Sequence, residues 1–180
     1  RAGVSIIYQE FNLIPDLTIR ENIFLGQEPT KAGFVRMSDE RRDVVALFEK
    51  IGMKMDSETR CRDLTVAQQQ KVEIAKALSV DAQIIVMDEP TAALTTQEVN
   101  HLFAIIQDLQ DHGIGIIYIS HRLDEIFEVA DRVMVLRDGE HVGTEEIGAV
   151  SRERLIEMMV GRPIESEFPK RAADAGAERL

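Results

Sequence analysis

The chain has 180 residues, of which 44% are hydrophobic and 29% are charged, and its formal net charge is -11. This balance is typical of a globular domain with an apolar core, and the excess of acidic residues argues against a nucleic-acid-binding surface. The single cysteine, Cys61, excludes an internal disulfide framework, and no apolar run reaches the roughly 18 residues of a membrane-spanning helix.

The chain starts with a run rich in β-branched residues, Val4–Tyr8, which predicts a buried strand followed directly by Gln9. Helical patterns with interruptions then continue until the next strand pattern appears near residue 83. We therefore expect residues 13–80 to form an all-helical insertion between two strands of one sheet. The stretch 26–37 within this insertion is expected to be a loop.

Start and stop signals define the helices of the insertion. Thr18 and Glu21 match a capping box, in which each side chain accepts a hydrogen bond from the other residue's backbone N–H. Ser38 is placed to cap the next helix, which Gly52 ends. A third helix starts near Ala67, and its apolar residues recur on one stripe.

Beyond residue 83 the pattern alternates between strands and helices. It predicts strands over 83–89, 115–120, 132–139 and 140–146, and helices over 95–113, 121–130 and 151–160. The series strand, helix, strand, helix, strand predicts an α/β fold with a parallel sheet covered by helices. Asp138 and Gly139 mark a tight turn between the last two strands.

Polar side chains follow three of these strands at the point where each strand ends: Gln9, then Asp88 with Glu89, and then His121. Ligands bind outside the carboxyl ends of the strands in an open parallel sheet, so we expect these side chains to share one edge. Asp88 is suited to hold Mg²⁺ directly or through water. Glu89 is suited to accept a proton from a water molecule that attacks a γ-phosphate.

The other two side chains fit the same reaction. Gln9 can bind the metal or the attacking water without adding charge, and His121 can hydrogen-bond the γ-phosphate. Taken singly, each group has a structural alternative: a glutamine in a loop, a helix-capping Ser-His pair, or a turn with exposed acids. Their combination at one sheet edge favours nucleotide hydrolysis.

The order of these motifs resembles that of the ATP-binding cassette (ABC) transporter ATPases over about residues 3–160. The resemblance is carried by the strand before Gln9 and by the stretches "LTVAQQQKVEIAKAL", "IIVMDEPTAALT" and "IIYISH". It implies ATP and Mg²⁺ as cofactors. It also implies these roles: Gln9, Q-loop glutamine and metal ligand; Leu64, Thr65, Val66, Ala67 and Gln68, signature motif; Asp88, Walker B acid; Glu89, catalytic glutamate; Ala92–Thr95, D-loop; His121, switch histidine.

The same resemblance implies a P-loop NTPase-like parallel sheet core with an inserted α-helical subdomain. The expected divisions are 1–12, core strand and Q-loop; 13–80, helical subdomain with the signature motif; 81–160, RecA-like core; and 161–180, linker towards a second cassette. The sequence contains no G-x-x-x-x-G-K-[ST] phosphate loop, which in the family lies upstream of the Q-loop. We therefore expect a fragment truncated at its N-terminus, which would be inactive alone.

Two departures from the family pattern narrow the resemblance. The signature usually reads Leu-Ser-Gly-Gly-Gln, but Val66 and Ala67 occupy the two glycine positions. Glycine allows backbone N–H groups to approach a phosphate closely, so these side chains are expected to weaken the contact with ATP. The D-loop usually ends in aspartate, and here it ends in Thr95. Both departures resemble the first cassette of the double-cassette ATPases that energise monosaccharide uptake.

The implied function is that of the ATP-binding and ATP-hydrolysing subunit of an ABC importer for a monosaccharide. The implied partners are transmembrane permease subunits, a second nucleotide-binding cassette and, indirectly, a periplasmic sugar-binding protein, without nucleic acid. The implied location is peripheral, on the cytoplasmic face of the inner membrane. Phe11, Leu13 and Ile14 either contact the membrane subunits or pack within the insertion. The alternative function is that of a soluble ABC-type ATPase acting on the translation or DNA repair machinery, against which the net charge of -11 counts.

Overall fold

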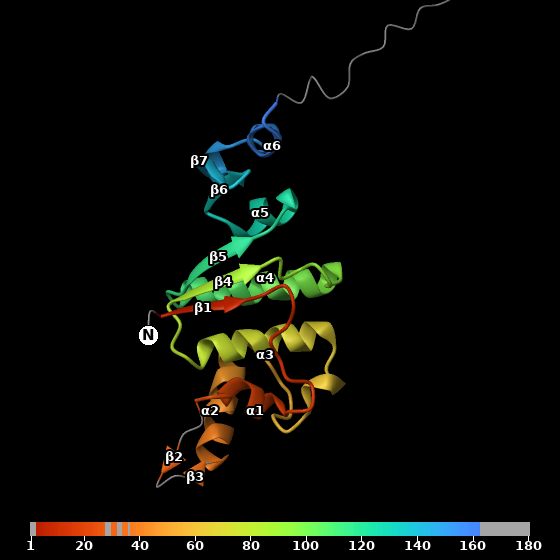
Figure 1. Ribbon diagram of the computed structural model, residues 1–180, viewed down its shortest axis with the longest axis vertical. Coiled ribbons are helices and arrows are strands. Elements are labelled where there is room, and N and C mark those ends of the chain that lie inside the picture. Colours follow the sequence, from red (N-terminus) through yellow and green to blue (C-terminus); the bar gives the residue numbers. More distant parts are fainter. Residues whose placement is uncertain (1–2, 28–29, 32–33, 36, 163–180) are drawn as a thin grey trace, which may run out of the picture. The chain divides into compact units, whose positions relative to one another are not determined.

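The computed structural model describes residues 3–27, 30–31, 34–35 and 37–162. The chain forms two compact units, Arg1–Glu125 and Ile126–Leu180, and each is described by itself (Figure 1). The expected linker over 161–180 lies outside the described residues, apart from its first two positions. No helix in the described ranges combines the length and the hydropathy that crossing a bilayer requires.

The first unit is organised around a three-stranded parallel sheet. Its strands are β1 (Val4–Ile7), β4 (Ile84–Asp88) and β5 (Gly115–Ile119), and β4 lies in the middle. β1 and β4 are hydrogen-bonded neighbours although about 75 residues separate them along the chain, so the predicted insertion between two sheet strands is confirmed. The parallel α/β core is likewise confirmed for this unit.

The described residues of the insertion form the helices α1 (Ile19–Phe24), α2 (Met37–Lys50) and α3 (Val66–Leu78), with a short 3₁₀ turn at Cys61–Asp63. The capping box of Thr18 and Glu21 is present at the start of α1, as predicted. The prediction that Ser38 caps α2 is wrong, because that helix already includes Met37.

The prediction of a loop over 26–37 is also incomplete. Two short strands, β2 (Thr30–Lys31) and β3 (Phe34–Val35), pair there in an antiparallel hairpin. Each strand has two residues, which is too short for an alternating pattern to appear in the sequence.

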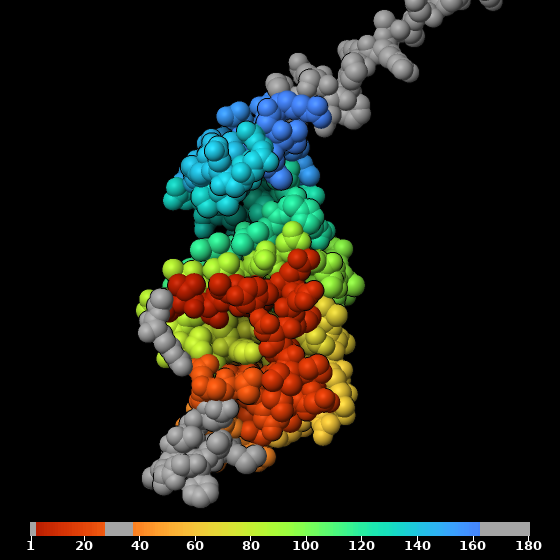
Figure 2. Space-filling view, in the orientation of Figure 1, coloured from red at the N-terminus to blue at the C-terminus, as the bar shows by residue number. Residues whose placement is uncertain are grey.

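Side chains alternate across the parallel sheet, and within the described residues of this unit one face is buried while the other is largely exposed. Ile7, Ile85 and Met87 point to the covered face and are at most 1% exposed. Helix α4 (Thr96–Asp111) lies behind the sheet in the view of Figure 1. The opposite face carries apolar side chains that are 37–52% exposed: Val4, Ile6, Ile84, Ile117 and Ile119. Figure 2 shows β1, in red, at the surface of the unit.

The second unit contains β6 (Arg132–Arg137), β7 (Glu140–Glu146) and α6 (Arg152–Val160), while α5 (Leu123–Val129) spans the boundary between the units. Asp138 and Gly139 both have positive φ, which confirms the predicted tight turn. This turn makes β7 the antiparallel partner of β6.

Candidate functional site

The carboxyl ends of β4 and β5 bring two of the predicted site residues together. Asp88 is the last residue of β4 and Glu89 follows it, while His121 lies two residues beyond β5. The backbone N–H of Glu89 donates a hydrogen bond to the carbonyl oxygen of Ile119 at 2.9 Å, which continues the pairing of the two strands. His121 Nδ1 lies 2.9 Å from Glu89 Oε1. The predicted proximity of these side chains is confirmed, and their roles remain predictions.

Glu89 has an unusual backbone conformation. Its φ is +45°, in the left-handed region that residues with a side chain avoid. The residue also precedes Pro90, and a following proline favours extended backbone at the residue before it. Such strain costs on the order of 1–3 kcal/mol and accumulates at functional sites. The conformation therefore supports a functional role for Glu89.

The residues beside Glu89 have the chemistry of a magnesium site. The Asp88 side chain is half-buried, and in the described part of the chain it forms no hydrogen bond or ion pair. Gln9 is exposed and lies two residues beyond the end of the neighbouring strand β1. No cluster of three acidic, histidine or cysteine ligands occurs among the described residues. Mg²⁺ commonly takes one or two carboxylates and completes its shell with water and phosphate, so Asp88 and Gln9 fit it.

The predicted signature residues lie at the start of α3. Thr65 is the N-cap of this helix, and it forms a capping box with Gln68 in which Gln68 Oε1 accepts from the Thr65 N–H at 2.8 Å. Leu64 is buried, Ala67 is half-buried, and Val66 is 39% exposed. None of the described contacts joins these residues to Asp88, Glu89 or His121. The structure thus shows a capping function for Thr65 and Gln68, and their contact with ATP stays a prediction.

Thr95 also has a structural function. It is the N-cap of α4, and its backbone N–H and hydroxyl both donate to Glu98 Oε2 at 2.8 Å. These hydrogen bonds hold the pKa of Glu98 below its usual value. The end of the predicted D-loop is therefore fixed to the first turn of α4.

The segment after Gln9 is attached to α3 through Asn12. The Lys76 ammonium donates a hydrogen bond to the Asn12 carbonyl oxygen at 3.0 Å. Glu73 is buried, and this burial raises the pKa of its carboxyl group. Nearby, Ile14 is 42% exposed, which is compatible with the predicted partner contact but does not test it.

We expect the Glu73→Gln variant to be more stable than the wild type at pH 7. Because the pKa of Glu73 is raised in the folded state, its protonated carboxyl group contributes its full stability below the unfolded-state pKa of 4.5. That contribution is lost as the pH rises through the folded-state pKa. The neutral amide removes this loss. Urea unfolding from pH 4 to pH 8 measures the difference in free energy of unfolding between the variant and the wild type, with Glu49→Gln at an exposed position as the control. A stability difference that does not grow with pH would contradict the assignment.

We expect His121→Ala to reduce ATP hydrolysis without affecting folding. The His121 side chain is 71% exposed, so its loss should change the free energy of unfolding by less than about 0.5 kcal/mol. The loss of one hydrogen bond to a charged group should lower the rate by about 10- to 100-fold. Steady-state hydrolysis and thermal melting of the full-length protein measure the two effects, with His101→Ala as the control. A lost melting transition would instead indicate a structural role.

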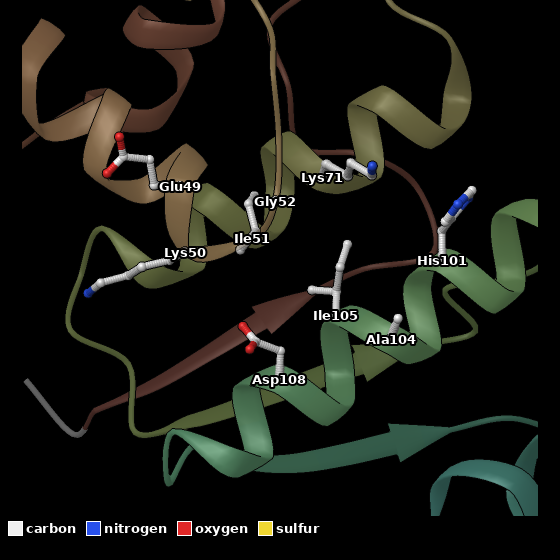
Figure 3. A pocket seen from close by; sticks show the side chains of 9 residues that line it. All are labelled: Glu49, Lys50, Ile51, Gly52, Lys71, His101, Ala104, Ile105 and Asp108. Atoms are coloured by element: carbon white, nitrogen blue, oxygen red, sulfur yellow. The ribbon is translucent and has the colours of Figure 1, made fainter.

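An open cleft of the first unit lies away from these residues. It has a volume of about 380 Å³ and is formed by the end of α2 with α3 and α4 (Figure 3). Its lining residues are Glu49, Lys50, Ile51, Gly52, Lys71, His101, Ala104, Ile105 and Asp108. None of the predicted site residues is among them, so the candidate site is defined by the strand ends and not by this cleft.

Sequence reasoning missed the buried pair Thr91 and Glu125, which lies next to the candidate site. Thr91 is 2% exposed and Glu125 is 4% exposed, and the threonine hydroxyl lies 2.9 and 2.8 Å from the two carboxylate oxygens. The adjacent acids Asp124 and Glu125 look equivalent in the sequence, although only Glu125 is buried. The order "SHRLDE" gives no signal that distinguishes them.

Comparison with known proteins points to one family. The sequence profile described as ABC transporter matches residues 1–92. Ribose import ATP-binding protein RbsA 3 of Rubrobacter xylanophilus is 48% identical over 176 residues, which cover 98% of this chain and 36% of that protein. RbsA 2 of Burkholderia ambifaria is 51% identical over 180 residues, with the same coverages of 98% and 36%. The chain thus spans about a third of the length of these relatives.

Solved structures show the same likeness. One is a dimeric, post-hydrolysis state of an ATP-binding cassette bound to ADP and Pi, with 26% identity and a TM-score of 0.66 over 80% of this chain and 62% of that one. Another is an inward-facing putative metal-chelate type ABC transporter, with 15% identity and a TM-score of 0.76 over 89% of this chain and 65% of that one. At 15% identity, the second likeness concerns the fold alone.

Proposed function

Because the chain belongs to the ABC transporter family, we propose that it forms part of the ATP-binding subunit of a sugar importer and carries that subunit's hydrolytic residues. The observation that carries this proposal is the 2.9 Å contact between Glu89 Oε1 and His121 Nδ1 at the carboxyl ends of two adjacent parallel strands. This is the edge of an α/β sheet at which ligands bind.

Each residue at this sheet edge has its own role in ATP hydrolysis under this proposal. Glu89 accepts the proton of the attacking water, and His121 holds the γ-phosphate and orients the Glu89 carboxylate. Asp88 and Gln9 hold Mg²⁺, which, when bound, neutralises the charge on the phosphate oxygens. The backbone strain at Glu89 supports this proposal, because strained residues cluster at functional sites.

Two further elements of the reaction lie in other parts of the protein under this proposal. The 180 residues contain no phosphate loop, so the backbone N–H groups and the lysine that grip the phosphates come from another segment. A second cassette supplies a second nucleotide site. The signature residues at the start of α3 then face the nucleotide of that second cassette. There the Val66 side chain hinders close contact between the backbone N–H groups and the phosphate.

The names of the relatives support a monosaccharide as the transported substrate, since RbsA proteins are ribose import proteins. We propose that permease subunits in the membrane receive the motion of the cassettes on the cytoplasmic face. A periplasmic sugar-binding protein delivers the sugar to them. The exposed Ile14, next to the segment anchored by Asn12, is the proposed contact with the permease.

The test uses the full-length protein that contains this chain, purified with and without its permease. The proposal expects ATP hydrolysis that requires Mg²⁺, and uptake of radiolabelled ribose or another monosaccharide into proteoliposomes that contain ATP. Hydrolysis without transport of any sugar would refute the importer assignment. The absence of any Mg²⁺-dependent hydrolysis would refute the ATPase assignment itself.

A further inference from the structure

Glu125 is a buried carboxylate with four side-chain partners. It is 4% exposed, and a carboxylate that is removed from water requires compensating contacts. Its partners are Thr91 Oγ1 at 2.8 and 2.9 Å, Tyr118 OH at 2.8 Å, Ser120 Oγ at 3.1 Å and Arg122 Nη1 at 2.6 Å. The three hydroxyl groups donate hydrogen bonds, and the guanidinium adds a charge-assisted contact. We call these five side chains the Glu125 cluster.

In the sequence, members of the Glu125 cluster lie close to both Glu89 and His121. Thr91 lies two residues beyond Glu89, in the turn after β4. The other three partners flank His121 on both sides, and the Ser120 hydroxyl additionally accepts a hydrogen bond from the Arg122 N–H at 3.0 Å. One carboxylate therefore connects the turn that carries Glu89 to the turn that carries His121.

Tyr118 links the cluster to helix α4. Burial, and then the hydrogen bond to Glu125, raise the pKa of the Tyr118 hydroxyl, so it remains a donor at physiological pH. Its ring packs edge-to-face against Phe103 of α4, with ring centroids 6.1 Å apart. The cluster is thus anchored to the helix that covers the sheet as well as to the two turns.

On this geometry we propose that Glu125 is a positioning residue for ATP hydrolysis. It holds the turn around His121 against Thr91, and this keeps His121 Nδ1 in contact with Glu89 Oε1. The inference rests on the proposed function, and it assigns to Glu125 no contact with nucleotide. A purely local role, such as stabilising the first turn of α5, would require hydrogen bonds to the backbone of that helix. The four partners of the carboxylate are instead side chains, and Thr91 belongs to a different turn.

The test compares Glu125→Gln with Glu128→Gln in the full-length protein. Glu128 is exposed on the same helix and serves as the matched control. A misplaced catalytic group typically costs up to about 100-fold, so Glu125→Gln should lower kcat by about 10- to 100-fold while KM for ATP changes less than about threefold. In a His121→Ala background the same substitution should have little further effect on kcat. Equal losses in both backgrounds, or an unchanged kcat, would overturn the proposal.

A second measurement does not depend on activity. In protein carrying ¹³C-labelled histidine, Glu89→Gln should change the NMR chemical shifts of the His121 ring, because the two side chains are in contact. In a Glu125→Gln background this change should be largely lost. If the full-length protein hydrolyses no ATP, the proposed function fails, and the NMR comparison alone decides whether Glu125 positions His121. If Glu89→Gln changes the His121 chemical shifts equally in the wild-type and Glu125→Gln backgrounds, the positioning role is refuted.

Discussion

The Glu89→Gln variant of the full-length protein is expected to bind ATP normally and to hydrolyse it about 10²- to 10⁴-fold more slowly than the wild type. The amide has the shape of the carboxylate and still offers His121 an oxygen at the position of Oε1, so the site should keep its geometry. Only the ability to accept a proton from water is lost. Single-turnover hydrolysis, together with ATP binding by calorimetry, separates the chemical step from binding.

Two further variants sharpen this prediction. The exposed Glu49→Gln should leave the hydrolysis rate unchanged, which controls for the loss of one negative charge. Asp88→Asn should weaken ATP binding in the presence of Mg²⁺ and have little effect in its absence, since Asp88 is assigned to the metal. A wild-type rate for Glu89→Gln would remove the assignment of Glu89 as the proton acceptor.

The second large effect is expected in the helical insertion. Arg20, on α1, is 4% exposed, and its guanidinium contacts Glu40 of α2, which is 2% exposed, and Glu58. The hydrogen bond to Glu58, together with the contact to Glu40, raises the pKa of Arg20, so it stays charged. Arg20→Met should destabilise the insertion by about 3–5 kcal/mol, because Glu40 is left buried without a partner.

Two comparisons test this mechanism. The double variant Arg20→Met/Glu40→Met should recover most of the lost stability, since apolar side chains often replace a buried ion pair at little cost. Arg62→Met removes the exposed pair with Asp16 and should cost no more than about 1 kcal/mol. Hydrogen exchange in α1 and α2 reports the local effect. A similar, small loss for Arg20→Met and Arg62→Met would show that burial of the pair is irrelevant.

The proximity of Glu89 and His121 at one sheet edge could be predicted from the sequence because it depends on local periodicity. The apolar runs of β4 and β5 each end at a polar residue. Parallel pairing of the strands brings those ends together independently of the structure of the connecting segment. The capping box at the start of α1 was predictable for the same reason, since its two residues lie three positions apart.

Features that depend on distant residues could not be predicted. Arg20 meets Glu40 across two helices, and neither residue differs in pattern from its exposed neighbours. Glu125 meets Thr91 across 34 positions, and no spacing rule relates them.

The left-handed backbone at Glu89 has a consequence for protein engineering. Glycine and asparagine adopt this conformation at lower cost than glutamate, so either residue at position 89 should relieve strain. A library screened for thermal stability alone is therefore expected to enrich substitutions at this position, and the selected proteins would lack the proposed proton acceptor. If Glu89 has the proposed role, selection for stability at this position acts against turnover, so stabilised variants should retain this residue.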